Sequence, residues 1–583
     1  MKCDIDAQLR GHGIGRPRAL TCAGLMFVAL ALSLSQSRAQ SAAAAVTEGD
    51  PPVVEIEDGK LRGLRYGTAV VFKGIPFASP PIGDLRWREP QPVVPWSNVR
   101  DATQPGSSCT QSTAGLNNFI EPLAQAYGAH YSGEPVRSSE DCLYLNVWMP
   151  AGPPHGPLPV MVWMHGGANI AGSGSESTYD GVGLVSHGVL LVTINYRLGV
   201  FGFFSHPELT AESAHHSSGN YGLLDQLAAL RWVRKNIGRF GGDPDNVTLF
   251  GESAGAIDAG LLMASPLSNG LFRRVISESG PAFGPGRPLE EAEAAGAAVG
   301  TAAPARFAST LQNLRALPAA QVVDLANKVL QARFPDVAGA VILDGWVLPR
   351  SPQQTFVQGL IAKVDLLIGL NGREMSAFRV AAASRTAAAP KSASKTDGGG
   401  AGGQTIGKLA DTMSPLYGGW TYPAIAWYFS RMLIHRDAGI DKAANDVIAA
   451  CPMGAMATLV RAAGQTAYVY RFERTVPGKG AANLGAFHSL EIPYVFHAFD
   501  DPVWRWLPFT DVDLRLSASI AAYWTQFAKS GNPNSTGFPE WPAWNNDAEP
   551  FLEFGVDGRV TAQRDFAPIF CNLSPDRLRA RLK

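Results

Sequence analysis

The chain has 583 residues, of which 46% are hydrophobic and 17% charged, a balance typical of a well-packed globular protein and not of a disordered or fibrous one. This length exceeds that of a usual single domain, although large α/β enzymes reach it without dividing. The formal net charge of −1 gives no reason to expect nucleic acid or an anionic membrane surface as a partner.

Residues 1–39 have the features of a secretory signal peptide. A mostly apolar stretch at residues 19–34 is followed by Ser-Arg-Ala at residues 37–39, which fits a cleavage site with small residues. Four basic side chains precede the apolar stretch: Lys2, Arg10, Arg16 and Arg18. Because the stretch is short and rich in serine for a membrane anchor, we expect cleavage after Ala39 and a secreted or periplasmic protein. We expect residues 40–52 to form a flexible leader, and no later stretch to be long enough for stable membrane insertion.

Two of the six cysteines, Cys3 and Cys22, lie in the signal segment. Four cysteines in an exported chain predict two disulfide bonds, for which three pairings are possible. These four are Cys109, Cys142, Cys451 and Cys571.

The rest of the chain alternates between strand and helix patterns. Short apolar runs within residues 53–72 predict antiparallel edge strands, and residues 221–237 have helical spacing. Continuous apolar runs, typical of strands buried on both faces, occur at residues 158–164, 189–196, 247–250, 275–277, 364–370 and 466–472. The alternation predicts an α/β fold with a large, mostly parallel sheet flanked by helices, and residues 53–583 as one domain.

Residues 381–403 are a low-complexity segment rich in alanine, glycine and serine. Such a composition does not bury a core. We expect a flexible surface excursion within the domain, with a lid beside the functional site as the alternative.

The most informative segment is Val-Thr-Leu-Phe-Gly-Glu-Ser-Ala-Gly at residues 247–255. It joins an apolar strand to a helix-forming run through a G-x-S-x-G turn, in which a side chain at Gly251 or Gly255 would collide with a neighbouring strand or helix. A chain with 62 glycines produces the pentapeptide by chance, but not readily between such elements. Ser253 is therefore the candidate nucleophile of a serine hydrolase.

A serine nucleophile needs hydrogen-bond donors for the oxyanion that forms during acyl transfer. Residues 161–168 read Met-Val-Trp-Met-His-Gly-Gly-Ala, a strand that ends in a glycine-rich loop. Alone, the loop indicates only a tight turn. Next to the serine turn, it predicts an oxyanion hole formed by the N–H groups of Gly167, Ala168 and Ala254.

Two long motifs and three shorter ones carry a family resemblance. The long motifs are FGGDPDNVTLFGESAG at residues 240–255 and EDCLYLNV at residues 140–147. The shorter ones are FKGIPFASPPIGDLRW from Phe72, INYRLGVFGF from Ile194 and YWTQFAKSGNPN from Tyr523. From about Pro52 to the C-terminus, the sequence resembles the type-B carboxylesterases, which include cholinesterases and bacterial para-nitrobenzyl esterases. The resemblance implies an α/β-hydrolase fold and cofactor-free hydrolysis of carboxylic esters through an acyl-enzyme.

The resemblance also implies the partners of Ser253. The acid matches Glu374 in Gly-Leu-Asn-Gly-Arg-Glu (residues 369–374), and the base matches His488 in Gly-Ala-Phe-His-Ser-Leu-Glu (residues 485–491). The order Ser, Glu, His is that of α/β-hydrolases. His165 and His497 are the competing bases. The resemblance also implies that Glu252 and Ser279 are secondary residues that tune the site.

The family pattern pairs Cys109 with Cys142 and Cys451 with Cys571. The chain departs from the pattern at Ala168, where many members have glycine, and at Asn169, where an aromatic residue is common. These departures bear on the shape of the pocket.

The segment between Cys109 and Cys142 contains no tryptophan; its aromatic residues are Phe119, Tyr127 and Tyr131. Cholinesterases bind the choline cation on a tryptophan of this loop. Choline esters are therefore not expected as specific substrates.

Two classes of function compete. The main reading is a serine carboxylesterase that acts on a small-molecule ester, with an amidase or a specialised polyester, phthalate or mycotoxin esterase left open. The rival is a catalytically silent binding or adhesion module of the same fold, which the filled triad positions disfavour. No H-E-x-x-H or Cys-x-x-Cys motif is present, so neither metal nor cofactor is expected. The oligomeric state is left open.

Overall fold

The computed structural model describes residues 50–583 except 113, 134, 153–155, 308, 334–340, 389–422, 425, 429–440, 569, 572 and 583. The expected signal peptide and residues 40–49 of the expected leader lie outside the described residues. Every element below belongs to one compact unit, Glu48–Lys583.

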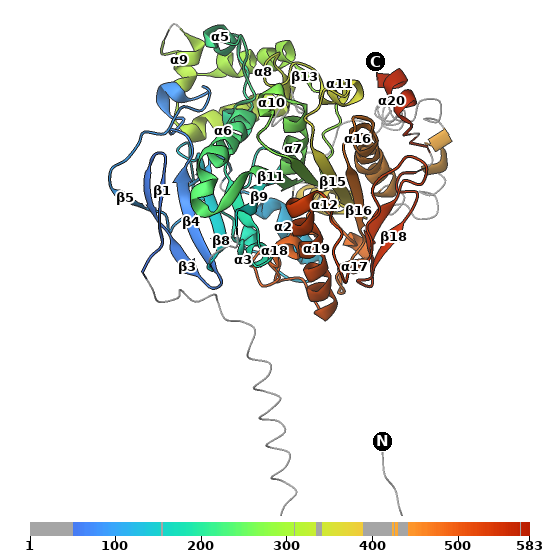
Figure 1. Ribbon diagram of the computed structural model, residues 1–583. Helices are drawn as coiled ribbons and strands as arrows, with labels where there is room; N and C mark the ends of the chain where they lie inside the picture. Colours follow the sequence, from blue (N-terminus) through green and yellow to red (C-terminus); the bar gives the residue numbers. More distant parts are fainter. Residues whose placement is uncertain are drawn as a thin grey trace, which may run out of the picture. The chain divides into compact units, whose positions relative to one another are not determined.

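The described part of the chain is organised around an eleven-stranded sheet with the order β18-β17-β16-β15-β12-β11-β9-β10-β8-β4-β3 (Figure 1). Neighbouring strands from β17 to β10 run parallel, whereas β18 on one side and β8, β4 and β3 on the other are antiparallel. The strands are β3 (Leu64–Tyr66), β4 (Ala69–Pro76), β8 (Tyr144–Pro150), β9 (Leu158–Met164), β10 (Leu190–Ile194), β11 (Gly242–Glu252), β12 (Arg274–Glu278), β15 (Asp365–Asn371), β16 (Ala467–Phe472), β17 (Phe551–Phe554) and β18 (Val560–Gln563).

Three small sheets lie outside the large one. They are β1 (Val53–Ile56) with β2 (Gly59–Arg62) and β5 (Val99–Asp101), β6 (Ser108–Cys109) with β7 (Ser138–Ser139), and β13 (Arg287–Pro288) with β14 (Ile342–Leu343). The expected antiparallel strands within residues 53–72 are therefore divided between the β1-β2-β5 sheet and the edge of the large sheet.

Helices cover both faces of the sheet. The longer ones are α2 (Asn117–Ala126), α6 (Tyr221–Asn236), α7 (Ala254–Ala264), α8 (Leu289–Ala302), α10 (Ala319–Arg333), α12 (Glu374–Ala388), α16 (Cys451–Ala462) and α19 (Asp511–Ser530). The shorter ones are α3 (Val182–Val185), α4 (Gly199–Gly202), α5 (Pro207–Glu212), α9 (Thr310–Arg315), α11 (Pro352–Gln358), α17 (Ala481–Leu484), α18 (Ile492–Phe496) and α20 (Pro575–Leu582).

Strand β9 shows how the core is divided. Its alternate residues point to opposite faces, and they belong to two separate apolar clusters: Val160, Val162 and Met164 in one, Met161 and Trp163 in the other. The first cluster includes side chains of α6, α7 and α16, and the second those of α18 and α19. The parallel strands are therefore buried on both faces, as their continuous apolar runs predict.

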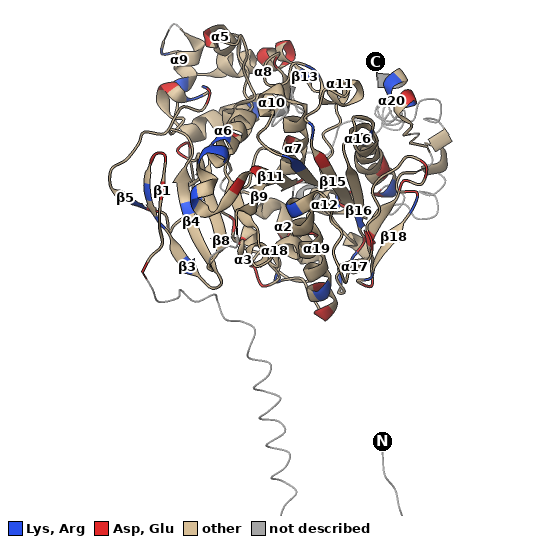
Figure 2. Ribbon diagram, viewed as in Figure 1, with Lys and Arg blue, Asp and Glu red and all other residues tan. Residues whose placement is uncertain are grey.

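Charged residues are scattered over the outer helices and strands, and uncharged residues predominate in the central strands (Figure 2).

The predicted strands and the predicted helix are confirmed, with small shifts in their ends. Helix α6 ends at Asn236, one residue before the predicted end, and β15 extends to Asn371, one residue beyond it. The antiparallel strand β18 at the C-terminal edge was not expected from the sequence.

The segment 381–403 begins in a helix. Residues 381–388 continue α12, and Ala381 is fully buried. Residues 389–403, on which the lid alternative depends, lie outside the described residues.

We expected no stretch long enough to span a membrane, and this expectation is wrong, because one helix has the length and the apolar composition to do so. Asp441–Ala462 forms a continuous helix that is long and apolar enough, and it includes a π-helical segment, Asn445–Ala450. However, 89% of its most apolar window is buried inside the protein. Its apolar character is therefore that of a core helix.

Both disulfide bonds implied by the resemblance are present, Cys109–Cys142 and Cys451–Cys571. The first closes the segment that contains α2. The second joins the start of α16 to the chain just before α20.

Candidate active site

Ser253 lies in a sharp turn between β11 and α7. Its backbone has φ 55° and ψ −122°, a strained combination for a residue with a side chain. A Cβ at Gly251 would lie 2.6 Å from the carbonyl oxygen of Met164, and one at Gly255 would lie 2.0 Å from it. Both glycines are therefore required by close packing against the end of β9, as predicted.

His488 and Glu374 are brought together from distant parts of the sequence. Glu374 is the first residue of α12, directly after the turn that follows β15, and His488 lies in the loop before α18. His488 Nδ1 is 2.6 Å from Glu374 Oε2, and both side chains are buried. The other Glu374 oxygen, Oε1, accepts a hydrogen bond of 2.6 Å from the backbone N–H of Asn371. The carboxylate is thus held at both oxygens.

The second nitrogen of His488 faces the residue that precedes Ser253. Nε2 lies 3.2 Å from Glu252 Oε1, which also accepts a hydrogen bond of 2.6 Å from Ser489 Oγ. Within the described residues, the Ser253 hydroxyl forms no hydrogen bond. His488 therefore lies between two glutamates, one of which directly precedes Ser253 in the sequence.

Burial and these two carboxylates have opposite effects on His488. Burial, the largest effect, lowers the pKa of the imidazole, but Glu252 and Glu374 outweigh it and raise the pKa to about 9. Burial also raises the pKa of Glu252, against the opposing influence of His488 and Ser489.

The two competing histidines lie in settings that do not suit a base. His165 stacks on Tyr196 with ring centroids 4.4 Å apart, and its Nδ1 lies 2.8 Å from the carbonyl oxygen of Gly166. Burial lowers the pKa of His165 to about 4. His497 Nδ1 lies 2.8 Å from Ser517 Oγ. Neither has a carboxylate partner among the described contacts, whereas His488 has two.

Sequence reasoning missed two polar residues beside the site, Glu491 and Asn371. Glu491 accepts hydrogen bonds from Ser279 Oγ at 2.8 Å and from the Asn371 side-chain amide. Burial, Glu252 and Glu374 together raise the pKa of Glu491 to about 8. Glu491 follows His488 by three residues and Asn371 precedes Glu374 by three, so the motifs already contained both. Ser279, expected as a secondary position, acts on this cluster through Glu491.

The glycine-rich loop after β9 has an unusual backbone. Gly167, Ala168 and Asn169 all have positive φ, at 104°, 55° and 57°. Within the described residues, the N–H groups of Gly167 and Ala168 donate no hydrogen bond. Ala254 is the first residue of α7, where the N–H has no acceptor within the helix. These three N–H groups are the ones that the sequence predicts as oxyanion donors.

Phe378, which packs against Phe119, forms an aromatic wall beside His488 that sequence reasoning did not anticipate. The ring centroid of Phe378, on α12, lies 4.9 Å from that of His488 and 5.3 Å from that of Phe119, on α2. Phe378 is 39% exposed. The wall offers an apolar contact surface next to the imidazole.

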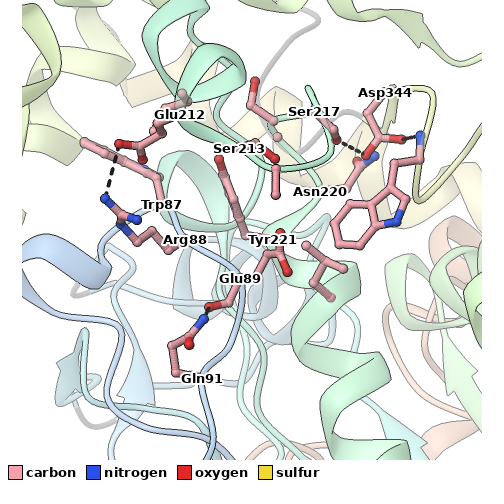
Figure 3. A pocket seen from close by; sticks show the side chains of 16 residues that line it. Trp87, Arg88, Glu89, Gln91, Glu212, Ser213, Ser217, Asn220, Tyr221 and Asp344 are labelled. Carbon is pink, nitrogen blue, oxygen red and sulfur yellow. Dashed lines mark hydrogen bonds and ion pairs between the residues drawn. The ribbon is translucent and has the colours of Figure 1, made fainter.

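A polar cavity of about 240 Å³ lies elsewhere on the protein (Figure 3). The polar groups at its wall pair with one another: Ser217 Oγ donates to Asp344 at 2.8 Å, and Arg88 contacts Glu212 at 3.3 Å. None of the candidate catalytic residues lines it.

No group of three or more His, Cys, Asp or Glu side chains is arranged to hold a metal ion in the part of the chain that the structure describes.

Comparisons with known proteins show the family of the chain. The model of the carboxylesterase family matches residues 50–567. Carboxylesterase 1C of Mus musculus is 32% identical over 530 residues, which cover 87% of this chain and 90% of that protein. Fumonisin B1 esterase of Sphingopyxis macrogoltabida is 34% identical over 525 residues, covering 88% of each.

Solved structures give the same result. A PNB esterase superposes with a TM-score of 0.72 at 31% identity, covering 91% of this chain and 99% of that one. A carboxylesterase of Geobacillus stearothermophilus gives 0.70 at 32% identity, covering 91% and 100%. The fold is that of the α/β-hydrolases. The chain belongs to the carboxylesterase family and is a carboxylic ester hydrolase.

The packing at the turn leads to a first prediction. Gly255→Ala should lower the free energy of unfolding by about 3 kcal/mol, because the new methyl group must displace the end of β9. Gly238→Ala is the matched control, since its Cβ meets nothing within 4 Å, and it should change stability by less than about 1 kcal/mol. Equal urea denaturation midpoints for the two variants would contradict this reading of the turn.

Proposed function

We propose that this carboxylesterase hydrolyses small-molecule carboxylic esters with Ser253 as nucleophile, His488 as general base and Glu374 as the acid that orients the imidazole. The observation that carries the proposal is the position of His488. One nitrogen lies 2.6 Å from Glu374 Oε2, and the other lies 3.2 Å from the carboxylate of Glu252, the residue that precedes Ser253.

The proposed reaction has two halves. Ser253 Oγ attacks the ester carbonyl carbon while His488 Nε2 takes its proton, and the N–H groups of Gly167, Ala168 and Ala254 stabilise the oxyanion. As the tetrahedral intermediate collapses, the imidazolium gives the proton to the leaving alcohol. Water, deprotonated by His488, then attacks the acyl-enzyme, and the proton returns to Ser253 as the carboxylic acid leaves.

Each half of the reaction needs a hydrogen bond between His488 Nε2 and the oxygen that gives up or receives the proton. In the structure, Nε2 lies against Glu252 instead. Catalytic hydrogen bonds commonly tighten only once substrate binds. We propose that Glu252 holds the imidazole until the substrate arrives and stabilises the imidazolium that forms during each proton transfer.

The aromatic wall supports an apolar group on the substrate. Phe378 lies beside His488 and packs against Phe119, and an acyl or alcohol group packed on these rings gains from apolar burial. The binding-module alternative is disfavoured because the three triad positions are filled and two of them are directly bonded.

Export completes the proposal. The signal-like segment at residues 1–39 and the two disulfide bonds both suit an oxidising compartment outside the cytoplasm. N-terminal sequencing of the exported protein should begin at Gln40. Recovery of only the uncleaved chain would contradict this part of the proposal.

The nucleophile is tested by para-nitrophenyl esters with acyl chains of two to twelve carbons. Ser253→Ala should fold as the wild type does and lose turnover by a factor of about 10⁴ or more. Ser186→Ala, at an exposed serine, should retain full activity. Full activity in Ser253→Ala would identify another nucleophile, and a folded wild type inactive on every ester would favour the binding module.

The two glutamates around His488 predict a pH dependence. A base with a raised pKa is protonated, and therefore inactive, below that pKa, so kcat/KM should rise with pH to a midpoint near 9. Glu252→Gln removes one neighbouring negative charge, which lowers the pKa of His488 and moves the midpoint to lower pH.

Profiles of kcat/KM between pH 6 and 10 check this shift, with the exposed Glu290→Gln as a charge-matched control. A midpoint that stays in place, or moves upward, in Glu252→Gln alone would show that Glu252 does not act on the imidazole.

A further inference from the structure

The residue that follows the oxyanion loop is anchored beneath it. Asn169 is buried, and its Nδ2 donates a hydrogen bond of 3.1 Å to Asp258 Oδ1. Asp258 is completely buried on α7, the helix that starts next to Ser253. The bond therefore joins the oxyanion loop to the helix of the nucleophile.

The loop needs such an anchor because its backbone is strained. Ala168 and Asn169 both have a left-handed conformation, which costs a residue with a side chain about 1–2 kcal/mol. Such conformations persist only where surrounding contacts hold them in place. The carbonyl oxygen of Asn169 accepts a bond of 2.6 Å from the N–H of Gly199, so Asn169 is held by its backbone on one side and its side chain on the other.

The anchor itself is built from polar groups in the core. The second oxygen of Asp258, Oδ2, accepts a hydrogen bond from Gln226 Nε2 of α6. Burial, only partly offset by the Gln226 and Asn169 bonds, raises the pKa of Asp258 to about 7. The amide oxygens Asn169 Oδ1 and Gln226 Oε1 are buried without a partner among the described residues. Burying a carboxyl group and two amides in the core costs free energy of folding. We infer that these groups serve to orient the parts of the chain that they join, and not to stabilise the fold.

The position of Asp258 in α7 explains why its hydrogen bond to Asn169 must be oriented. Asp258 lies five residues after Ser253 in one continuous element. The start of α7 thus presents Ser253 and the N–H of Ala254. A little over one turn further, Asp258 holds the loop that carries the N–H groups of Gly167 and Ala168. The N–H of Ala254 and the N–H groups of Gly167 and Ala168 are therefore both held by the same helix.

We propose that Asp258 is a positioning residue of the ester hydrolysis, which through Asn169 fixes the oxyanion donors of the glycine-rich loop relative to Ser253. This inference rests on the proposed function of the site. It gives a role to Asn169, the position at which the chain departs from the aromatic residue common in the family.

The test uses the full-length enzyme with Asn169→Ala, Asp258→Ala and the double variant. The measurements are kcat and KM on para-nitrophenyl butyrate, and the inhibition constant of a trifluoromethyl ketone analogue of that ester, which forms the oxyanion on Ser253. Each single variant should lower kcat by about 10- to 100-fold, change KM less than about threefold, and weaken the ketone in parallel with kcat/KM. The kcat of the double variant should be no lower than that of the less active single variant, because each substitution removes the same hydrogen bond between Asn169 and Asp258.

Two further variants separate positioning from folding. Asp258→Asn retains an amide oxygen for Asn169, and its new amide group meets Gln226 once that side chain turns its oxygen inward. This variant should keep kcat within about fivefold of the wild type, as expected when a hydrogen bond is replaced and not left unmade. Asn220→Ala is the matched control, since Asn220 is an equally buried asparagine bonded to the backbone of Ile342, away from the site. It should leave kcat unchanged.

Unchanged kcat in Asn169→Ala or Asp258→Ala would overturn the inference, as would losses that add in the double variant or a rise in KM alone. These outcomes are distinct from failure of the proposed function, which appears as an inactive wild type or an active Ser253→Ala.

Discussion

The close approach of β9 to the nucleophile turn is the constraint on which the rest of the site depends. The carbonyl oxygen of Met164 lies where a side chain at Gly251 or Gly255 would be. This contact fixes the left-handed turn at Ser253 and, because the glycine-rich loop begins directly after Met164, also sets where that loop starts. The proposed nucleophile and the proposed oxyanion donors are therefore placed by the packing of adjacent parallel strands.

Around this turn, buried charge controls the chemistry. His488 lies between Glu374 and Glu252, and a third carboxyl, Glu491, is bonded to Ser279 nearby. Burial and the neighbouring Glu252 and Glu374 raise the pKa of Glu491, and the same two glutamates raise the pKa of His488 against the effect of burial. The arrangement favours an imidazolium, the state that His488 reaches in each of the proposed proton transfers.

Much of this could be predicted from the sequence, because it depends on local patterns. The run of apolar residues before G-x-S-x-G predicted β11, the turn and α7, and family motifs indicated Glu374 and His488. Apart from the disulfide and Glu374–His488 pairs that the family motifs implied, contacts between segments distant in sequence could not be predicted. Phe119 meets Phe378, and Asn169 meets Asp258, only because the sheet brings α2 beside α12 and the loop beside α7. The apolar stretch at residues 441–462 shows the same limit, since its burial depends on the helices and strands around it.

The most direct test of the account is an NMR titration of the His488 imidazole in the free enzyme, assigned by comparison with His488→Gln. We expect a pKa near 9, well above the 6.5 of an unperturbed histidine, because two carboxylates outweigh burial. A pKa at or below 6.5 would contradict it, since burial would then dominate and the glutamates would not face the ring as described.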